Sequence, residues 1–496
     1  MRLRHATILL LTGSSLALGA SACLAQESQE APCAAATERS AAGEIEDLLT
    51  AYHRVGRFDG VALVARGDCV LLERGWGLAN RDWGIPNEPD ARFRIASITK
   101  AFTAVAIHEL ALAGRLDLDA PASRYLAAMD AAATGRYTVR QLLWHRSGLP
   151  DFNYDPEFFD YVQRTSTPWD SVLARAAQAP LRFTPGSDFG YSNDGYWLLG
   201  AVLESVTGES WAAAIDSLVL RPLGLEHTVP DDPLAPQPRR ATGYRDAFDG
   251  LTVALPYRAT ADAGLWSTAG DLHRFLAALT DPARTPEPLR RAIWEDRPDG
   301  NAQGWTRDTV RFTPDGPRYR LFRQDGAVYG FFATTFLVPE RGWIVILLTN
   351  YRRPYNSLRE IAMQVTGVLE GGTPTPPVET LGSRVEALRR TEGVDRAIGC
   401  LRDARCRGAA VVNETELNVW AWFLAERGEP DHAVRAFDAL TALLPTAAAT
   451  WYGLASNAAD VGDVATARRA LESLLALDPT NAGGLALRAR LEERTH

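Results

Sequence analysis

The sequence predicts a mixed α/β (α+β) domain, in which helices flank an antiparallel sheet, followed by an all-helical segment. Two apolar hairpins lie near the ends of the first region, and stretches with helical spacing lie between them. A Gly/Pro/Thr-rich stretch at 371–380 then separates this region from a segment with an internal repeat. At 496 residues the chain exceeds the roughly 250–300 residues at which a single core stops growing, so two domains are expected.

The two hairpins are the clearest strand signals. Val61–Ala65 and Cys69–Leu72 form one pair of apolar runs, and Phe331–Val338 and Gly342–Leu348 form the other. Each pair flanks a short turn that contains Gly or Pro, which is typical of antiparallel neighbours. Because strands lie at both ends with helices between them, we expect one antiparallel sheet with helices packed on it.

The helical signals between the hairpins come from apolar spacing. From Phe102 to Leu110, within the stretch 97–113, apolar side chains recur three or four residues apart, and Gly114 follows as an end signal. A second apolar helix is predicted at Trp197–Val206.

The sequence is expected to divide into five parts. These are a signal peptide (1–25), a leader (26–42), the mixed domain (43–370), a linker (371–380) and a helical repeat domain (381–496).

The last of these parts repeats itself. Gly428 recurs as Gly462 and Ala433 as Ala467, in both cases 34 residues later. This period resembles that of tetratricopeptide repeats, in which paired helices stack on one another. The resemblance implies a surface on which a protein partner could dock.

The N-terminus has the pattern of an export signal. Arg2 and Arg4 precede an apolar stretch at 6–18, and small residues follow. Cleavage after Ala25 would give a soluble periplasmic or secreted protein, whereas cleavage after Ala22 would leave Cys23 for lipidation. Contact with a membrane is expected only in the lipidated case.

Cysteine content agrees with an oxidising compartment. Beyond Cys23 the sequence has Cys33, Cys69, Cys400 and Cys406, an even number that allows three pairings. Cys400–Cys406 is the most local pairing and would leave Cys33–Cys69 for the first domain. Reduced, buried thiols are the alternative.

The net charge of the chain excludes one class of partner. The formal charge is −9 and the pI about 5.5, without a basic run, so nucleic acid is not an expected partner.

Of the 52 basic residues, Lys100 is the only lysine. A desolvated ammonium can release its proton, whereas a guanidinium effectively cannot.

Ser97 lies three residues before this lysine, so on a helix the two side chains share a face. Ser97 is expected to begin the helix, where the positive end of the helix dipole disfavours a second cation and favours an oxyanion. The pair therefore predicts a serine nucleophile activated by a neutral amine. Further along, Tyr191 could serve as a general acid or base and Asn193 could orient the amine, although a Tyr-rich surface loop is the alternative.

Ser97-x-x-Lys100 and Tyr191-Ser192-Asn193 resemble, in this order, the first two motifs of the penicillin-recognising serine hydrolases, in particular their class C β-lactamase-like branch. The stretches 142–150, 222–225 and 264–272 resemble that branch as well, and the likeness spans about 60–350. The resemblance implies that Ser97 is acylated and that Lys100 helps to deprotonate it. It implies that Tyr191 serves the leaving group and that Asn193 contacts the substrate.

The same resemblance implies a third motif at Gln324-Asp325-Gly326 on a sheet-edge strand, where Gln324, Gly326 and Ala327 would line the substrate site. The N–H groups of Ser97 and Ala327 would form the oxyanion hole. The family usually has Lys or His at the position of Gln324, a cation that helps to hold the substrate carboxylate. Arg323 is adjacent but should point to the opposite face of the strand.

We therefore expect an exported serine hydrolase, an esterase or amidase/peptidase with a small-molecule or peptide substrate. The alternatives are a β-lactamase or DD-carboxypeptidase, and, from another class, an inactive hydrolase scaffold that binds a partner through its repeats. No cofactor is expected. No metal is expected either, because Leu112 occupies the second His position of the zinc-protease-like start at His108.

Overall fold

The computed structural model describes residues 34–126, 131–151, 169–232, 238–244, 260–294, 301–328, 330–351 and 358–493. The predicted signal peptide, Cys23 and Cys33 lie outside these ranges, so the pairing of Cys33 with Cys69 stays a prediction. Within them, every helix is too short or too polar to cross a membrane.

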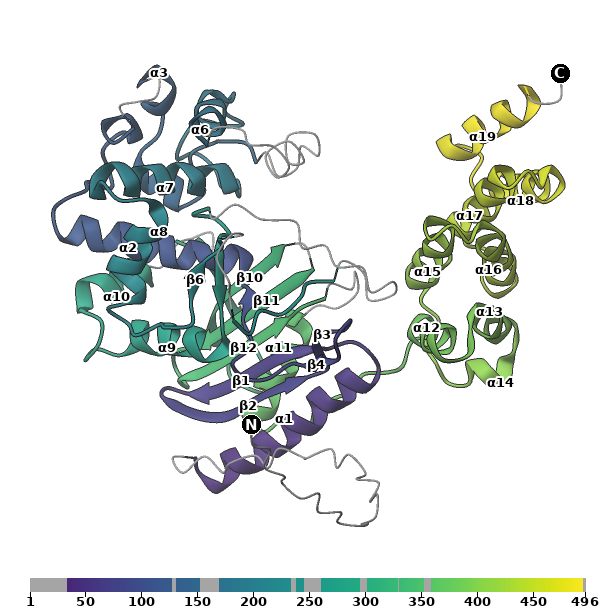
Figure 1. Ribbon diagram of the computed structural model, residues 1–496, viewed down its shortest axis with the longest axis horizontal. Coiled ribbons are helices and arrows are strands. Elements are labelled where there is room, and N and C mark those ends of the chain that lie inside the picture. Colours follow the sequence, from purple (N-terminus) through teal and green to yellow (C-terminus); the bar gives the residue numbers. More distant parts are fainter. Residues whose placement is uncertain are drawn as a thin grey trace, which may run out of the picture. The chain divides into compact units, whose positions relative to one another are not determined.

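A seven-stranded sheet forms the centre of the first region, with the order β2-β1-β12-β11-β10-β9-β8 and antiparallel neighbours throughout (Figure 1). Both predicted hairpins are confirmed, and β1 pairs with β12 so that the two hairpins join in the sheet. The strands are β1 (Gly60–Arg66), β2 (Cys69–Trp76), β8 (Asn301–Ala302), β9 (Trp305–Val310), β10 (Tyr319–Val328), β11 (Phe331–Val338) and β12 (Trp343–Thr349).

Helices cover both faces of this sheet, and β1 shows how the sequence achieves it. Val61, Leu63 and Ala65 face a core shared with α2 (Thr99–Leu112) and α9 (Ala269–Thr280). The alternate residues Ala62 and Val64 face a second core shared with α1 (Ala36–Arg54) and α11 (Leu358–Leu369). A strand with apolar side chains on both faces must be covered on both faces, and helices cover β1 on each side.

The expected leader is wrong at its C-terminal end. The prediction extends it to residue 42, but α1 already begins at Ala36 and buries Ile45, Leu49 and Tyr52 against the sheet. The Ala- and Glu-rich composition that suggested a leader is also favourable for a helix. Composition alone could not distinguish the two.

The remaining elements of the first region form a largely helical layer and two small sheets. The helices are α3 (Ala131–Thr134), α4 (Val139–Leu143), α6 (Trp169–Gln178), α7 (Asn193–Thr207), α8 (Trp211–Ile215) and α10 (Glu287–Ile293). The strands are β3 (Leu78–Asn80), β4 (Ile85–Pro86), β5 (Phe93–Arg94), β6 (Val229–Pro230) and β7 (Leu265–Ser267).

Beyond the linker the described chain is helical and has a hydrophobic core of its own. Its helices are α12 (Leu381–Glu392), α13 (Val394–Arg402), α14 (Ala404–Arg407), α15 (Glu414–Glu426), α16 (Pro430–Leu443), α17 (Ala448–Asp460), α18 (Val464–Leu477) and α19 (Ala482–Glu493). The bounds of α15 and α16 recur 34 residues later as those of α17 and α18. A disulfide joins Cys400 to Cys406, as predicted. The identification of the pairs as tetratricopeptide repeats stays a prediction.

Candidate active site

Ser97 lies in a single 3-10 turn, Ala96–Ile98, that leads directly into α2. The preceding Ala96 has φ 46°, in the left-handed region that residues with a Cβ rarely adopt. Ile95 and Ile98, both buried, hold the turn on either side. Such strain persists only where the surroundings impose it, and it is typical of functional sites. The predicted helix is confirmed, with Ser97 at its start.

Lys100 is fully buried and its Nζ has three oxygen neighbours. These are Ser97 Oγ at 3.1 Å, Asn193 Oδ1 at 2.6 Å and the carbonyl oxygen of Asp262 at 3.0 Å. An ammonium can donate to all three. A neutral amine can keep two N–H bonds on Asn193 and Asp262 and turn its lone pair to the Ser97 hydroxyl. The arrangement therefore suits both protonation states that a proton-accepting lysine must pass through.

Tyr191 is brought to the same oxygen from another part of the chain. Its hydroxyl donates to Ser97 Oγ at 3.1 Å, and its ring lies 5.1 Å from Lys100 Nζ. Tyr191 precedes α7, whose first turn is capped by Ser192: the Ser192 hydroxyl accepts the Gly195 N–H. The cap fixes the start of α7 and so places both Tyr191 and Asn193. The structure thus brings Ser97, Lys100, Tyr191 and Asn193 together, with Ser192 holding the last two in place.

The ring of His145 packs against the ring of Tyr191. The two rings stack with centroids 4.4 Å apart, and His145 Nδ1 accepts the backbone N–H of Ser192 at 3.1 Å. Burial, with a smaller contribution from the Lys100 charge, lowers the pKa of His145 to about 3. A histidine that stays neutral and accepts a backbone hydrogen bond is a structural support rather than a catalytic base.

This burial predicts a pH dependence of stability. The pKa of His145 is lowered in the folded protein, so as pH falls below the ordinary value of 6.5 only the unfolded chain binds the proton. Folding should lose about 1 kcal/mol per pH unit between pH 6 and 4 on account of this histidine. Urea unfolding of the wild type and of His145→Gln over this range measures it, because the variant should lack that part of the slope. Parallel curves would contradict the assignment.

Strand β10 supplies the third motif, and Gln324 contacts the nucleophile turn directly. Gln324 Nε2 donates to the Ser97 carbonyl oxygen at 2.8 Å. A Cβ on Gly326 would lie 2.1 Å from the carbonyl oxygen of Ile95, so only glycine lets β10 approach the turn this closely. Ala327 follows on the same strand and is exposed. The structure places these residues beside Ser97, while the oxyanion hole stays a prediction.

The expectation that this motif lies on a sheet-edge strand needs correction. β10 lies between β11 and β9, so it is an interior strand. Pairing with β9 runs only from Tyr319 to Arg323, whereas pairing with β11 continues to Val328. Among the described residues, the strand is therefore open on one side from Gln324 onward. The edge exists locally because β9 begins at Trp305 and its pairing with β10 stops at Thr306, opposite Arg323.

Arg323 does not replace the missing cation. Its guanidinium binds Asp308 at 3.2 Å and also Asp325. Asp325 in turn accepts from Arg359 at 2.6 Å. Because side chains alternate along a strand, these groups lie on the face opposite Gln324, as the sequence predicted.

Several residues of the site were not predicted from the sequence, and most of them carry no usable signal in it. Gln303 and Gly304 line a cavity of about 30 Å³ together with His145, Tyr191 and Gln324. Asp262 reaches Lys100 through its backbone carbonyl, a group that every residue has, while its side chain accepts the Trp197 indole N–H. Asp151 accepts a hydrogen bond from Asn193 and could have been found, because it directly follows the family-like stretch 142–150.

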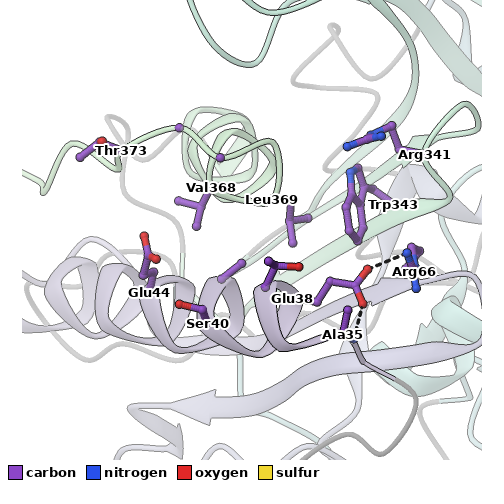
Figure 2. Close-up of a pocket in the computed structure, with 14 residues that line it drawn as sticks. Ala35, Glu38, Ser40, Glu44, Arg66, Arg341, Trp343, Val368, Leu369 and Thr373 are labelled. Atoms are coloured by element: carbon purple, nitrogen blue, oxygen red, sulfur yellow. Dashed lines mark hydrogen bonds and ion pairs between the residues drawn. The ribbon is translucent and has the colours of Figure 1, made fainter.

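A larger cavity, of about 510 Å³, lies on the α1/α11 face of the sheet, away from Ser97 (Figure 2). Three of its charged groups are bound to other groups of the chain. Glu38 binds Arg66 at 2.8 Å and accepts the Ala35 N–H at 2.8 Å, and Arg341 binds Glu370 at 2.8 Å. Paired charges of this kind stabilise the junction of helix and strand ends.

Comparison with known proteins agrees with the geometry. Residues 45–369 match the Beta-lactamase family. Esterase EstB of Burkholderia gladioli is 33% identical over 339 residues, which cover 58% of this chain and 85% of that protein. A penicillin binding protein from Bacillus halodurans superposes with a TM-score of 0.55 at 28% identity, covering 64% of this chain and 98% of that one.

A second solved structure, the octameric penicillin-binding protein homologue from Pyrococcus abyssi, has a TM-score of 0.56 at 25% identity. It covers 70% of this chain and 81% of its own. The family match spans the sheet, the nucleophile turn and all three motifs, and it ends where α11 ends. The chain therefore belongs to the Beta-lactamase family and is a serine hydrolase of β-lactamase-like fold.

Proposed function

We propose that the protein is an esterase or amidase/peptidase that hydrolyses substrates lacking a carboxylate near the scissile bond, through an acyl-Ser97 intermediate. The observation that carries the proposal is the pair of hydrogen bonds on Ser97 Oγ, from Lys100 and Tyr191, each 3.1 Å long. A hydroxyl flanked by two groups able to exchange protons is an activated nucleophile. The likeness to an esterase at 33% identity supports the ester branch of the proposal.

The proposed reaction uses these groups in sequence. Neutral Lys100 accepts the Ser97 proton as Oγ attacks the substrate carbonyl carbon, and the carbonyl oxygen becomes an oxyanion held by the N–H groups of Ser97 and Ala327. Tyr191 gives its proton to the leaving group as the carbon–oxygen or carbon–nitrogen bond breaks, and it recovers a proton from Lys100. Water then attacks the acyl-enzyme by the same route in reverse and releases the acid and free Ser97.

The substrate preference rests on Gln324. Its amide is neutral and one of its N–H groups is already bound to the Ser97 carbonyl oxygen. The nearest guanidinium on the strand, that of Arg323, is bound to two carboxylates. A substrate carboxylate at this position would lose its hydration without gaining a cationic partner, which is unfavourable. Neutral esters and amides avoid that cost.

The test is hydrolysis of 4-nitrophenyl acetate by the purified mature protein, with Ser97→Ala as the inactive control. A matched ester that carries a carboxylate, 4-nitrophenyl hydrogen succinate, and a chromogenic cephalosporin complete the set. We expect the neutral ester to be turned over at least about tenfold more efficiently than the anionic ester. Preference for the cephalosporin or the anionic ester would favour the β-lactamase or carboxypeptidase alternative. Absence of activity on all three would favour the scaffold alternative.

We also propose that the protein is exported, either free or lipidated at Cys23. The N-terminal pattern and the Cys400–Cys406 disulfide, a bond typical of oxidising compartments, support this. The intact mass of the protein isolated from its host distinguishes cleavage after Ala25 from a diacylated Cys23. An unprocessed Met1 in that mass would contradict export.

A further inference from the structure

The amide of Asn193 lies between a buried amine and a buried carboxylate. Its Oδ1 accepts from Lys100 Nζ at 2.6 Å, and its Nδ2 donates to Asp151 Oδ2 at 2.9 Å. Lys100 is fully buried, and Asn193 and Asp151 are 8% and 9% exposed. The three groups therefore form a short chain of hydrogen bonds that ends one step from the nucleophile.

We propose that Asp151 is a positioning residue: by fixing the orientation of the Asn193 amide, it keeps the Lys100 lone pair available to Ser97. The inference rests on the proposed acyl-Ser97 mechanism and extends it to a residue that does not touch the substrate. It gives the buried Asp151 carboxylate a role in the reaction through Asn193 and Lys100.

The orientation follows from donor and acceptor chemistry. An ionised carboxylate only accepts hydrogen bonds, so Asp151 must face the NH2 end of the Asn193 amide. The oxygen end is then left for Lys100. In the reversed amide, an oxygen would face the Asp151 carboxylate and an NH2 group would face the lysine. One carboxylate thus selects one of two amide orientations that have nearly the same shape.

The reversed orientation would damage catalysis in a specific way. An amide NH2 directed at the neutral Lys100 amine would donate into its lone pair, the same lone pair that must accept the Ser97 proton. The amine would also lose the oxygen that receives one of its N–H bonds. Ser97 would remain in place, but its base would be occupied.

The surrounding backbone holds Asp151 in position to do this. Ser192 Oγ donates to the carbonyl oxygen of Pro150 at 2.8 Å, one residue before Asp151. The Gly190 N–H, just before Tyr191, donates to the carbonyl oxygen of His145 at 2.8 Å. Segment 145–151 is therefore hydrogen-bonded to segment 190–192 at both of its ends, which fixes the backbone of Asp151 next to Asn193.

The test compares Asp151→Asn with the wild type. The substitution keeps the size of the side chain but lets both amides reverse together, so orientation is no longer imposed. The readout is the second-order rate constant at which a fluorophosphonate labels Ser97, followed by intact mass, together with the final fraction labelled. We expect a rate constant of about half the wild-type value or less, with complete final labelling, and a parallel loss in kcat/KM for 4-nitrophenyl acetate, because only the chains with the native Asn193 orientation react.

Asp271→Asn is the matched control, because Asp271 is also fully buried and hydrogen-bonded but lies on α9, outside the site. It should lower the melting temperature and leave the labelling rate constant unchanged. Wild-type rate constants in Asp151→Asn, whether or not the labelled fraction falls, would overturn the positioning role. A wild type that is not labelled at Ser97 would instead overturn the proposed function, and the inference with it.

Discussion

Lys100→Arg is expected to lower kcat/KM for a neutral nitrophenyl ester by roughly 10³-fold, close to the loss in Ser97→Ala. Arginine keeps a positive charge and can still donate to Asn193 and to the Asp262 carbonyl, so it stands in only for the protonated form of Lys100. It cannot release its proton at any accessible pH. The variant therefore separates the role of lysine as a cation from its role as a proton acceptor.

Rates from pH 5 to 10 give the measurement, and near-wild-type activity at any of these pH values would refute the amine as base. Lys100→Ala provides a second test, because small primary amines added to the solution should restore part of its activity if a proton acceptor is what is missing. Circular dichroism and melting temperature serve as controls for folding, since Lys100 is fully buried.

Tyr191→Phe should lower kcat/KM for an amide or alkyl ester by roughly 10²-fold or more, and much less for a nitrophenyl ester. The substitution removes the hydroxyl that donates to Ser97 Oγ but leaves the ring stacked on His145. Nitrophenolate leaves without protonation, whereas an alkoxide or amine anion does not. The effect of the variant should therefore grow with the basicity of the leaving group.

A series of acetate esters with leaving groups of increasing basicity measures this dependence in the wild type and the variant. A steeper dependence in Tyr191→Phe is the expected result. Equal losses across the series would mean that the hydroxyl only orients Ser97 and does not carry the leaving-group proton. Retained Ser97 labelling by a fluorophosphonate shows that the variant site is still assembled.

The parts of the site that lie close together in sequence were predictable from it. Ser97 and Lys100 are one helical turn apart, so local geometry alone brings their side chains together. The order of the motifs then placed Tyr191 and Asn193 near them through the family resemblance. The hairpins were predictable because short turns separate their apolar runs.

Contacts made by the backbone or across long distances could not be predicted. The carbonyl oxygen of Asp262 that binds Lys100 gives no sequence signal, because every residue has one. The point at which β9 begins, which leaves one side of β10 open from Gln324, depends on strand pairing that residue patterns do not specify. The predicted boundary between leader and domain at residue 42 is too late, because residues 36–42 have a composition shared by helices and linkers.

The pairing of β1 with β12 has a consequence for biosynthesis. Strands separated by nearly the whole domain must meet before the sheet is continuous, so the fold has many contacts between residues distant in sequence, and such folds form slowly. At usual rates of synthesis, roughly 15–60 s separate the emergence of the two strands. The nucleophile Ser97, in the turn before α2, is made early, whereas β10 and β12 are made late. Incomplete chains should therefore be inactive. Until β12 is made, the edge of β1 that pairs with it stays exposed, and we expect chaperones to bind chains in this state.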